Sequence, residues 1–401
     1  MIEHNTIEIE DNLLAGVYQK FPVIISKGKG AKLWDNTGKE YIDCMGGYGV
    51  SIIGHCNPKI QEAIQKQAQD LITCHGSLYN EVRAEFAEKL ISVCPNNLEK
   101  VYLGNSGAET VECALKIARK FTKKKKIIAM KGSYHGKTMG ALSTTWSQKY
   151  REPFQPLIPE VQFTSYGDID KISEVIDNDT AAIIIEPIQG ESGIHLPSKE
   201  FLPALREKCD SKGTLLICDE IQSGLGRTGK MWASEHWNVK PDIMCISKGI
   251  GGGIPLGATI ARGDIMDSLK VGDHTSTFGG NPLACKCGTA TIDYIINEDL
   301  VDKSYKLGKK FLAGLKELEE KYKSVREARG LGLMLGLEMR FEIKEIILES
   351  IKQGVIILYS GRNIVRLLPP LVINEEQINT TLEVLDQLIL KTESDRFRDV
   401  N

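Results

Sequence analysis

Short apolar runs without polar alternation mark the middle of the chain. They are AAIII at 181–185, TLLIC at 214–218 and IMCIS at 243–247, and a helical stretch at 199–212 separates the first two. Unalternating apolar strands that are separated by helices are typical of a parallel sheet covered by helices on both faces. The pattern from about residue 100 to 290 therefore predicts an α/β domain built on such a sheet.

The two ends of the chain have a different pattern. Near the N-terminus, LWDNTGKEYIDC at 33–44 predicts two short strands around a turn, and amphipathic helices are expected at 58–71 and 81–93. After residue 290 we expect helices near 291–323, 342–353 and 375–391, and strands at 331–338 and 354–358. The predicted parts are an N-terminal segment packing with the small domain (1–50), a large domain (51–290) and a small α+β domain (291–401).

Composition narrows the class of protein. The chain has 401 residues, which favours two domains, and its 42% hydrophobic and 26% charged content is ordinary for a soluble globular protein. A formal net charge of −3 gives no sign of a general nucleic-acid or lipid-surface role. No apolar run approaches the roughly 18 residues that span a membrane. We therefore expect neither nucleic acid nor a membrane as a partner.

Cysteine usage and the N-terminus suggest a reducing compartment. The ten cysteines include no CxxC pair, which is poor spacing for metal ligands, so no metal site is expected. The opening MIEHNTIEIEDNLL lacks the basic and apolar regions of a signal peptide. We interpret the thiols as reduced and mostly buried, and predict a cytoplasmic location.

Two glycine-rich stretches resemble nucleotide-binding motifs without matching them. GLGRTGKM at 224–231 has Met231 where a P-loop needs the Ser or Thr hydroxyl that binds magnesium. GIGGGI at 249–254 lacks the third glycine of the dinucleotide fingerprint at the required spacing. Neither an NTPase nor a dinucleotide enzyme is favoured.

Three predicted strands end in ionisable residues: Glu186, Asp219 and Lys248. Ligands of open parallel sheets bind outside the carboxyl ends of the strands, so these side chains should meet at one edge. A buried ion pair is one explanation. The other is pyridoxal phosphate chemistry, which needs a desolvated lysine for a Schiff base, a carboxylate at the pyridinium nitrogen and a phosphate cup. NSGAETVECALKIAR at 105–119 has the form of that cup, a glycine turn that opens a helix.

Seven segments in order strengthen the second explanation: NSGAETVECALKIAR, SYHGKTMGALS, IIEPIQGESGI, CDEIQSGLGRTG, SKGIGGGIPLGA, STFGGNPLA and VRLLPPL. Together they resemble class III (subgroup II) aminotransferases over about residues 20–390. The resemblance implies the pyridoxal-phosphate fold type I, with a large, mostly parallel seven-stranded sheet and a smaller α+β domain. It also implies a homodimer with active sites at the interface.

The resemblance implies a role in cofactor binding for eight positions. Lys248 matches the Schiff-base lysine and proton shuttle, and Asp219 the partner of the pyridinium nitrogen. Gln222 would bond the ring hydroxyl, and Tyr134 would stack on the ring where the family more often has Phe. Ser106, Gly107 and Ala108 would hold the phosphate, together with Thr277 of the neighbouring subunit.

Four further positions would bind substrate. Arg366 matches the arginine that clamps the α-carboxylate of glutamate or 2-oxoglutarate, and Glu191 the glutamate that masks it when a distal amine enters. Lys137 stands where many relatives have an arginine for the distal carboxylate and lacks its fork. Tyr48 would touch the substrate's α-carboxylate or amide linker. Glu186 is expected to be structural.

The substrate suggested by the resemblance is a diamino acid with a blocked α-amine. Two segments, YIDCMGGYGVSIIGHCNP (41–58) and TTWSQKYREPF (144–154), resemble the branch that acts on lysine or ornithine held by the acidic carrier protein LysW. Such a partner predicts a basic rim, with Lys27, Lys29 and Lys32 as candidates. The alternatives are N-acetylornithine, another class III ω-amino substrate, a different reaction such as glutamate-1-semialdehyde mutation, and a binding protein without activity.

Overall fold

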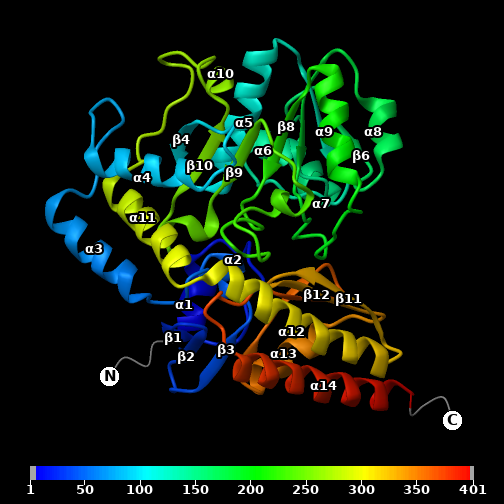
Figure 1. Ribbon diagram of the computed structural model, residues 1–401. Coiled ribbons are helices and arrows are strands. Elements are labelled where there is room, and N and C mark those ends of the chain that lie inside the picture. Colours follow the sequence, from blue (N-terminus) through cyan, green and yellow to red (C-terminus); the bar gives the residue numbers. More distant parts are fainter. Residues whose placement is uncertain (1–5, 398–401) are drawn as a thin grey trace.

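The computed structural model describes residues 6–397, which form three sheets and the helices around them (Figure 1). The strands of the large sheet are β4 (Lys100–Gly104), β5 (Lys126–Met130), β6 (Val161–Thr164), β7 (Thr180–Ile185), β8 (Leu215–Asp219), β9 (Ile243–Ile246) and β10 (Gly257–Ala261). The two smaller sheets contain β1 (Ile25–Lys29), β2 (Lys32–Asp35), β3 (Glu40–Asp43), β11 (Val325–Leu331), β12 (Met334–Met339), β13 (Val355–Ile356), β14 (Leu358–Ser360) and β15 (Ile364–Leu367).

The helices fall into three groups along the chain. The first group is α1 (Thr6–Leu13), α2 (Gly46–Gly49), α3 (Pro58–Asp70) and α4 (Glu81–Ser92). Around the large sheet lie α5 (Gly107–Thr122), α6 (Met139–Thr144), α7 (Gln148–Arg151), η1 (Glu152–Phe154), α8 (Ile169–Val175), α9 (Phe201–Lys212), η2 (Ala233–Trp237), η3 (Lys248–Gly251) and α10 (Gly263–Met266). The last group is α11 (Pro282–Asn297), α12 (Leu300–Lys321), α13 (Lys344–Lys352) and α14 (Glu375–Phe397).

The large sheet has the order β4-β10-β9-β8-β7-β5-β6. Only β10 runs antiparallel to its neighbours, so the predicted mostly parallel seven-stranded sheet is confirmed. The three apolar runs of the sequence are the adjacent strands β7, β8 and β9, and every residue in them is buried. They therefore place the ends of three neighbouring strands at one edge of the sheet.

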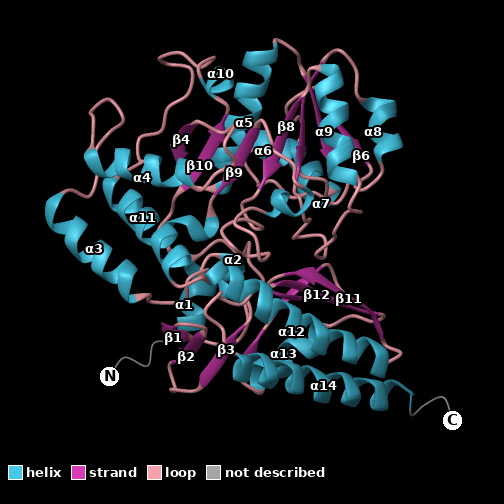
Figure 2. Ribbon diagram, in the orientation of Figure 1, coloured by secondary structure: helices cyan, strands magenta, loops and turns pink. Residues whose placement is uncertain are grey.

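Alternate residues of each central strand face two separate cores, which explains the absence of polar alternation. Ile183 and Ile185 pack into a core with Leu202 and Leu205 of α9, whereas Ile184 packs into a core with α5. A strand covered on both faces has no solvated side and stays apolar throughout. Figure 2 shows the strands of this sheet between helices on either side.

Segments from both chain ends form the remaining part of the molecule. Strand β13 pairs in parallel with β3, joining Val355 to Ile42, so the N-terminal sheet continues into the C-terminal region. The other small sheet has the order β11-β12-β15-β14, with α12 and α14 beside it (Figure 1). Helix α11 runs through position 290, where the sequence suggested a boundary. The three domain ranges themselves stay a prediction.

Among residues 6–397, no helix combines the length and apolar character needed to cross a membrane. All ten cysteines are free thiols, and seven of them are buried: Cys44, Cys113, Cys209, Cys218, Cys245, Cys285 and Cys287.

Candidate active site

Lys248 begins η3, directly after β9 and Ser247. Its backbone has φ +46°, a conformation that side chains rarely adopt, and the next residue, Gly249, allows a close approach to Ile52. A Cβ on Gly249 would lie 2.6 Å from Ile52 Cγ2. Burial lowers the pKa of the Lys248 amine to about 8 from 10.5, although the nearby Glu191 carboxylate opposes this shift. The amine is therefore poised to act as a nucleophile or base near neutral pH.

Asp219 ends β8, and its carboxylate is buried. Its Oδ2 accepts a hydrogen bond from His135 Nδ1 at 2.7 Å, and its Oδ1 accepts one from the backbone N–H of Ile221 at 3.1 Å. These two donors fix the orientation of the carboxylate. His135 had no predicted role, although it directly follows Tyr134 in the SYHGKT segment. The contact joins positions 84 residues apart, which no local pattern reveals.

Glu186 lies at the end of the neighbouring strand β7 and is buried. It accepts hydrogen bonds from the backbone N–H groups of Tyr134 at 3.0 Å and Gly190 at 3.2 Å. Burial and then the Asp219 charge raise the pKa of Glu186, to about 7. These contacts hold two loops of the site together and agree with the structural role expected for this residue.

The predicted phosphate cup lies at the start of α5. Ser106 is the N-cap of this helix, and its hydroxyl accepts a hydrogen bond from the Glu109 N–H at 3.3 Å. A Cβ on Gly107 would lie 2.8 Å from Ile221 Cδ1, so only glycine lets the helix start approach the Asp219–Gln222 turn this closely. Ala108 packs against Gly136 from the opposite turn.

Thr277 lies on an exposed loop beside that helix start. Asn105 donates a hydrogen bond to Ser276 Oγ at 3.2 Å, which holds the loop next to the cup. Exposure of Thr277 suits a residue that acts on a neighbouring subunit, and that role stays a prediction.

Arg366 and Glu191 form an ion pair at the centre of the site. Arg366 of β15 is fully buried, and its Nη1 donates to Glu191 Oε1 at 3.0 Å. Burial alone would raise the pKa of Glu191, but Arg366, Lys248 and Lys137 outweigh it and lower the pKa. The predicted contact between Glu191 and Arg366 is therefore present, and the two charges act on the Lys248 amine in opposite directions.

Tyr48 and Lys137 lie at the periphery of this pair. The guanidinium of Arg366 lies 5.7 Å from the centre of the Tyr48 ring, and Tyr48 itself has φ +59° within the α2 turn. Lys137 is exposed, and its ammonium lies 4.6 Å from the centre of the Tyr150 ring. Both contacts are cation–π in character.

Six of the predicted residues line one open cavity of about 1230 Å³: Tyr48, Tyr134, Lys137, Glu191, Lys248 and Arg366. A second cavity, of about 810 Å³, adjoins it, since Tyr134, Tyr150, Glu191 and Tyr359 line both. The suggested rim residues lie elsewhere. Lys32 pairs with Glu40, Lys27 lies over the Trp34 ring, and neither they nor Lys29 line the two cavities.

A lysine of lowered pKa beside a fixed carboxylate agrees with what the chain resembles. The family model "Aminotransferase class-III" matches residues 14–389. The chain belongs to the class III aminotransferases. It is therefore a pyridoxal-phosphate-dependent transaminase of fold type I.

Named relatives of this aminotransferase include acetylornithine aminotransferases. That of Methanopyrus kandleri is 46% identical over 95% of this chain and 98% of its own length. That of Methanocaldococcus jannaschii is 41% identical over 97% of this chain and 98% of its own length. Among solved structures, the ornithine aminotransferase of Toxoplasma gondii has a TM-score of 0.94 at 34% identity, covering 97% of this chain and 95% of that one. The acetylornithine aminotransferase of Elizabethkingia anophelis has a TM-score of 0.86 at 34% identity, and the match covers 96% of this chain and 98% of that one.

The residues of the aminotransferase fit the cofactor and substrate groups in a further respect. Several buried polar atoms have no hydrogen-bond partner among the described residues: Gln222 Oε1, His135 Nε2, and Nε and Nη2 of Arg366. Unpaired buried polar atoms are costly and point to a ligand that completes them. An amide oxygen can accept from a ring hydroxyl, and two guanidinium nitrogens can donate to a carboxylate.

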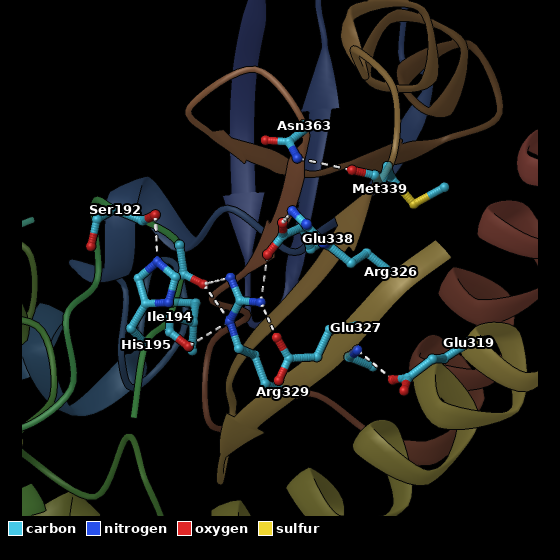
Figure 3. A network of polar contacts seen from close by, with 12 residues as sticks. Ser192, Ile194, His195, Glu319, Arg326, Glu327, Arg329, Glu338, Met339 and Asn363 are labelled. Carbon is cyan, nitrogen blue, oxygen red and sulfur yellow. Dashed lines mark hydrogen bonds and ion pairs between the residues drawn. The ribbon is translucent and has the colours of Figure 1, made fainter. Parts of the chain in front are cut away.

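A second arginine holds the loop that carries Glu191 (Figure 3). Arg329 of β11 donates from Nε to the carbonyl oxygens of Gly193 at 2.9 Å and Ile194 at 3.1 Å, and from Nη2 to Gly193 at 2.7 Å. Its Nη1 donates to Glu338 Oε2 at 2.7 Å and Glu327 Oε2 at 2.6 Å. This contact between the small sheet and the Glu191 loop had no signal in the sequence pattern.

Proposed function

We propose that this aminotransferase moves the terminal amine of a diamino acid with a blocked α-amine to 2-oxoglutarate, giving a semialdehyde and glutamate. The ion pair of Glu191 and Arg366 in the cavity of Lys248 carries this proposal. With the pair closed, the guanidinium of Arg366 is bound to Glu191 and not to an α-carboxylate, so an uncharged methylene chain with a terminal amine fits. Glutamate needs the opposite state, in which Arg366 is free.

Each remaining role belongs to a residue whose surroundings suit it. Bound pyridoxal phosphate would supply the electron sink. Asp219, oriented by His135, would keep the ring nitrogen protonated, and Gln222 would accept from the ring hydroxyl. Tyr134 would stack on the ring, and Ser106, Gly107 and Ala108 would hold the phosphate with the dipole of α5. Lys248 Nζ would take the proton from the substrate carbon that bears the amine and return it on the cofactor side.

The two substrates would alternate through one switch. When glutamate binds, its α-carboxylate takes the guanidinium of Arg366 in a bidentate contact and Glu191 turns away. Lys137 would contact the distal carboxylate as a point charge. When the blocked diamino acid binds, Glu191 returns to Arg366, and Tyr48 would contact the α-carboxylate or the amide linker.

Two blocking groups are in question. The names of the relatives favour N-acetylornithine. The segments 41–58 and 144–154 favour lysine or ornithine on the carrier protein LysW, and parts of both segments line the cavities. The pocket around Lys248 suits either, because each presents the same terminal amine. We further infer a homodimer, in which Thr277 completes the partner's cofactor site, and a cytoplasmic location, which suits ten free thiols.

A half-reaction experiment tests the proposal. The purified enzyme is mixed with glutamate, freed of it, and then offered aldehydes of N-acetylornithine, of carrier-linked lysine and ornithine, and of unblocked ornithine. We expect amine return to the blocked aldehydes and a loss of turnover of about a thousandfold or more in Lys248→Ala. Normal turnover in that variant, or a preference for the unblocked aldehyde, would refute the assignment. Activity on acetylornithine equal to that on the carrier form would exclude LysW as the physiological partner.

A further inference from the structure

Four cations line the second cavity, and three of them, which come from three separate segments, have no ion-pair partner among the described residues. Lys149 comes from α7, Lys344 from the start of α13, and Arg362 from the turn between β14 and β15. All three are exposed.

These cations are not neutralised within the part of the chain that the structure describes. No hydrogen bond or ion pair joins the side chain of Lys149, Lys344 or Arg362 to another described residue, whereas Lys20 in the same wall pairs with Asp11 at 2.9 Å. Of the two acidic wall residues, Glu191 is committed to Arg366 and only Glu342 remains. The second cavity therefore has an excess of unpaired positive charge.

The positively charged second cavity adjoins the cavity that contains Lys248. Tyr150 and Tyr359 line both cavities, so a chain that starts at Lys248 and passes these rings enters the second cavity. A diamino acid whose terminal amine reaches Lys248 has its α-carbon, and the group on its α-amine, at the far end. The group on the α-amine therefore lies at the end of the substrate that is farthest from Lys248.

The segment TTWSQKYREPF supplies much of this wall. Thr145, Trp146, Ser147, Lys149 and Tyr150 all line the second cavity. Lys149 and Tyr150 belong also to the first. None of the predicted cofactor-binding positions lies in this segment.

We propose that the second cavity binds a carboxylate carried by the group that blocks the substrate's α-amine. This inference rests on the proposed function, because only an α-amine-blocked substrate extends into the cavity. An acetyl group has no such charge. A dicarboxylic acyl group has one, and so does a glutamate linked through its side chain, whether alone or at the end of a carrier protein. Lys149, Lys344 and Arg362 would bind this carboxylate.

Substrates that differ only in the blocking group provide the test. The holoenzyme is assayed with N-acetylornithine, N-succinylornithine and ornithine linked to the γ-carboxyl of N-acetylglutamate. In the triple variant Lys149→Gln, Lys344→Gln, Arg362→Gln, the KM of the two carboxylate-bearing substrates should rise about tenfold more than that of N-acetylornithine. The charge-matched control is Lys199→Gln, Lys309→Gln, Lys323→Gln, which changes exposed lysines outside both cavities and should leave the ratio of KM values as in the wild type.

The outcomes separate this inference from the proposed function. Equal effects of the triple variant on acetyl and carboxylate-bearing substrates would overturn the carboxylate site while leaving the blocked-substrate assignment intact. No turnover of any blocked substrate would overturn both. Carrier-linked ornithine distinguishes the sources: if its KM changes with the triple variant by the same factor as that of the glutamate conjugate, the conjugated carboxylate is the group recognised. A response to salt larger than that of the acetyl substrate is also expected, since exposed charges are screened.

Discussion

Lys248 gains its reactivity from the residues around it. Desolvation lowers the pKa of its amine to about 8, so that above this pH most of the amine is the free base. The Glu191 carboxylate has the largest effect of the nearby charges, and it raises the pKa of the amine. The Arg366 cation has the next largest effect, and it lowers this pKa. The ion pair that we propose to select between substrates thus also affects the pKa of Lys248.

A change at Glu191 should therefore be visible at Lys248. In cofactor-free Glu191→Gln, the pKa of Lys248 should fall below about 8, because a carboxylate that favours the protonated amine is gone. The measurement is the pH dependence of reductive methylation of Lys248, followed by peptide mass spectrometry. Reaction should begin at lower pH than in the wild type.

The matched control is Glu342→Gln, which removes an equal charge from the second cavity but no group that acts strongly on Lys248. Its titration midpoint should equal that of the wild type. A midpoint in Glu191→Gln at or above the wild-type value would contradict the electrostatic account of the site.

The element that decides the state of Glu191 is its loop. Strand β11 holds this loop through Arg329 (Figure 3), and Ser360 at the end of β14 donates a hydrogen bond to the backbone carbonyl of Glu191. Since Arg366 lies on the adjacent strand β15, one small sheet positions both partners of the ion pair. In the proposed function, this sheet would couple the position of the Glu191 loop to substrate selection.

Loosening the loop should weaken the mask. In Arg329→Gln, three hydrogen bonds to Gly193 and Ile194 are lost, so Glu191 should pair with Arg366 less often. We expect the KM for the blocked diamino acid to rise about tenfold, whereas the KM for glutamate should fall or stay constant, because glutamate needs a free Arg366. Steady-state kinetics with each substrate varied in turn measures this split.

Arg326→Gln is the control for the ion-pair network. Arg326 also binds Glu338, at 3.0 Å, but no hydrogen bond joins it to the Glu191 loop among the described residues. Both KM values should stay near those of the wild type. If Arg329→Gln raised or lowered the two KM values in parallel, the arginine would have only a general structural role.

At the scale of the whole molecule, the cofactor site is expected to need two chains. Thr277 is exposed, does not line the cavity of Lys248, and lies on a loop tied to the phosphate cup by Asn105 and Ser276. An exposed hydroxyl next to the cup can complete a site on another chain. This arrangement would make dimer formation a condition for tight cofactor binding.

Mixed dimers test whether Thr277 of one chain completes the cofactor site of the other. Thr277→Val should weaken cofactor affinity about tenfold, because a hydrogen bond to a charged phosphate is lost. When this variant is mixed with Lys248→Ala, heterodimers contain a site with Lys248 from one chain and Thr277 from the other. The cofactor concentration for half-maximal activity should then return towards the wild-type value.

Thr275→Val, a change at an exposed neighbour on the same loop, should not alter cofactor affinity in homodimers. If the mixture required as much cofactor as the Thr277→Val homodimer, the hydroxyl would serve its own chain or none.

Local features of the sequence determined a definite part of this protein. The apolar runs located β7, β8 and β9, because strands buried on both faces cannot alternate, and their polar ends located Glu186, Asp219 and Lys248. The Ser106-Gly107 turn located the start of α5, because its capping chemistry acts within four residues. Each of these signals lies within one element or at its end.

Tertiary structure alone decided which distant residues meet. The hydrogen bond of His135 to Asp219 joins residues 84 positions apart, and that of Arg329 to Gly193 joins residues 136 positions apart. The pairing of β13 with β3 joins residues 313 positions apart. The cations Lys149, Lys344 and Arg362 likewise share a wall only because α7, the start of α13 and the turn between β14 and β15 pack around one cavity. Periodicity and capping report the surroundings of a residue along its own element, whereas the packing of whole elements sets contacts across the chain. The chemistry at Lys248 was therefore readable in the sequence, whereas the assembly of the walls of the two cavities was not.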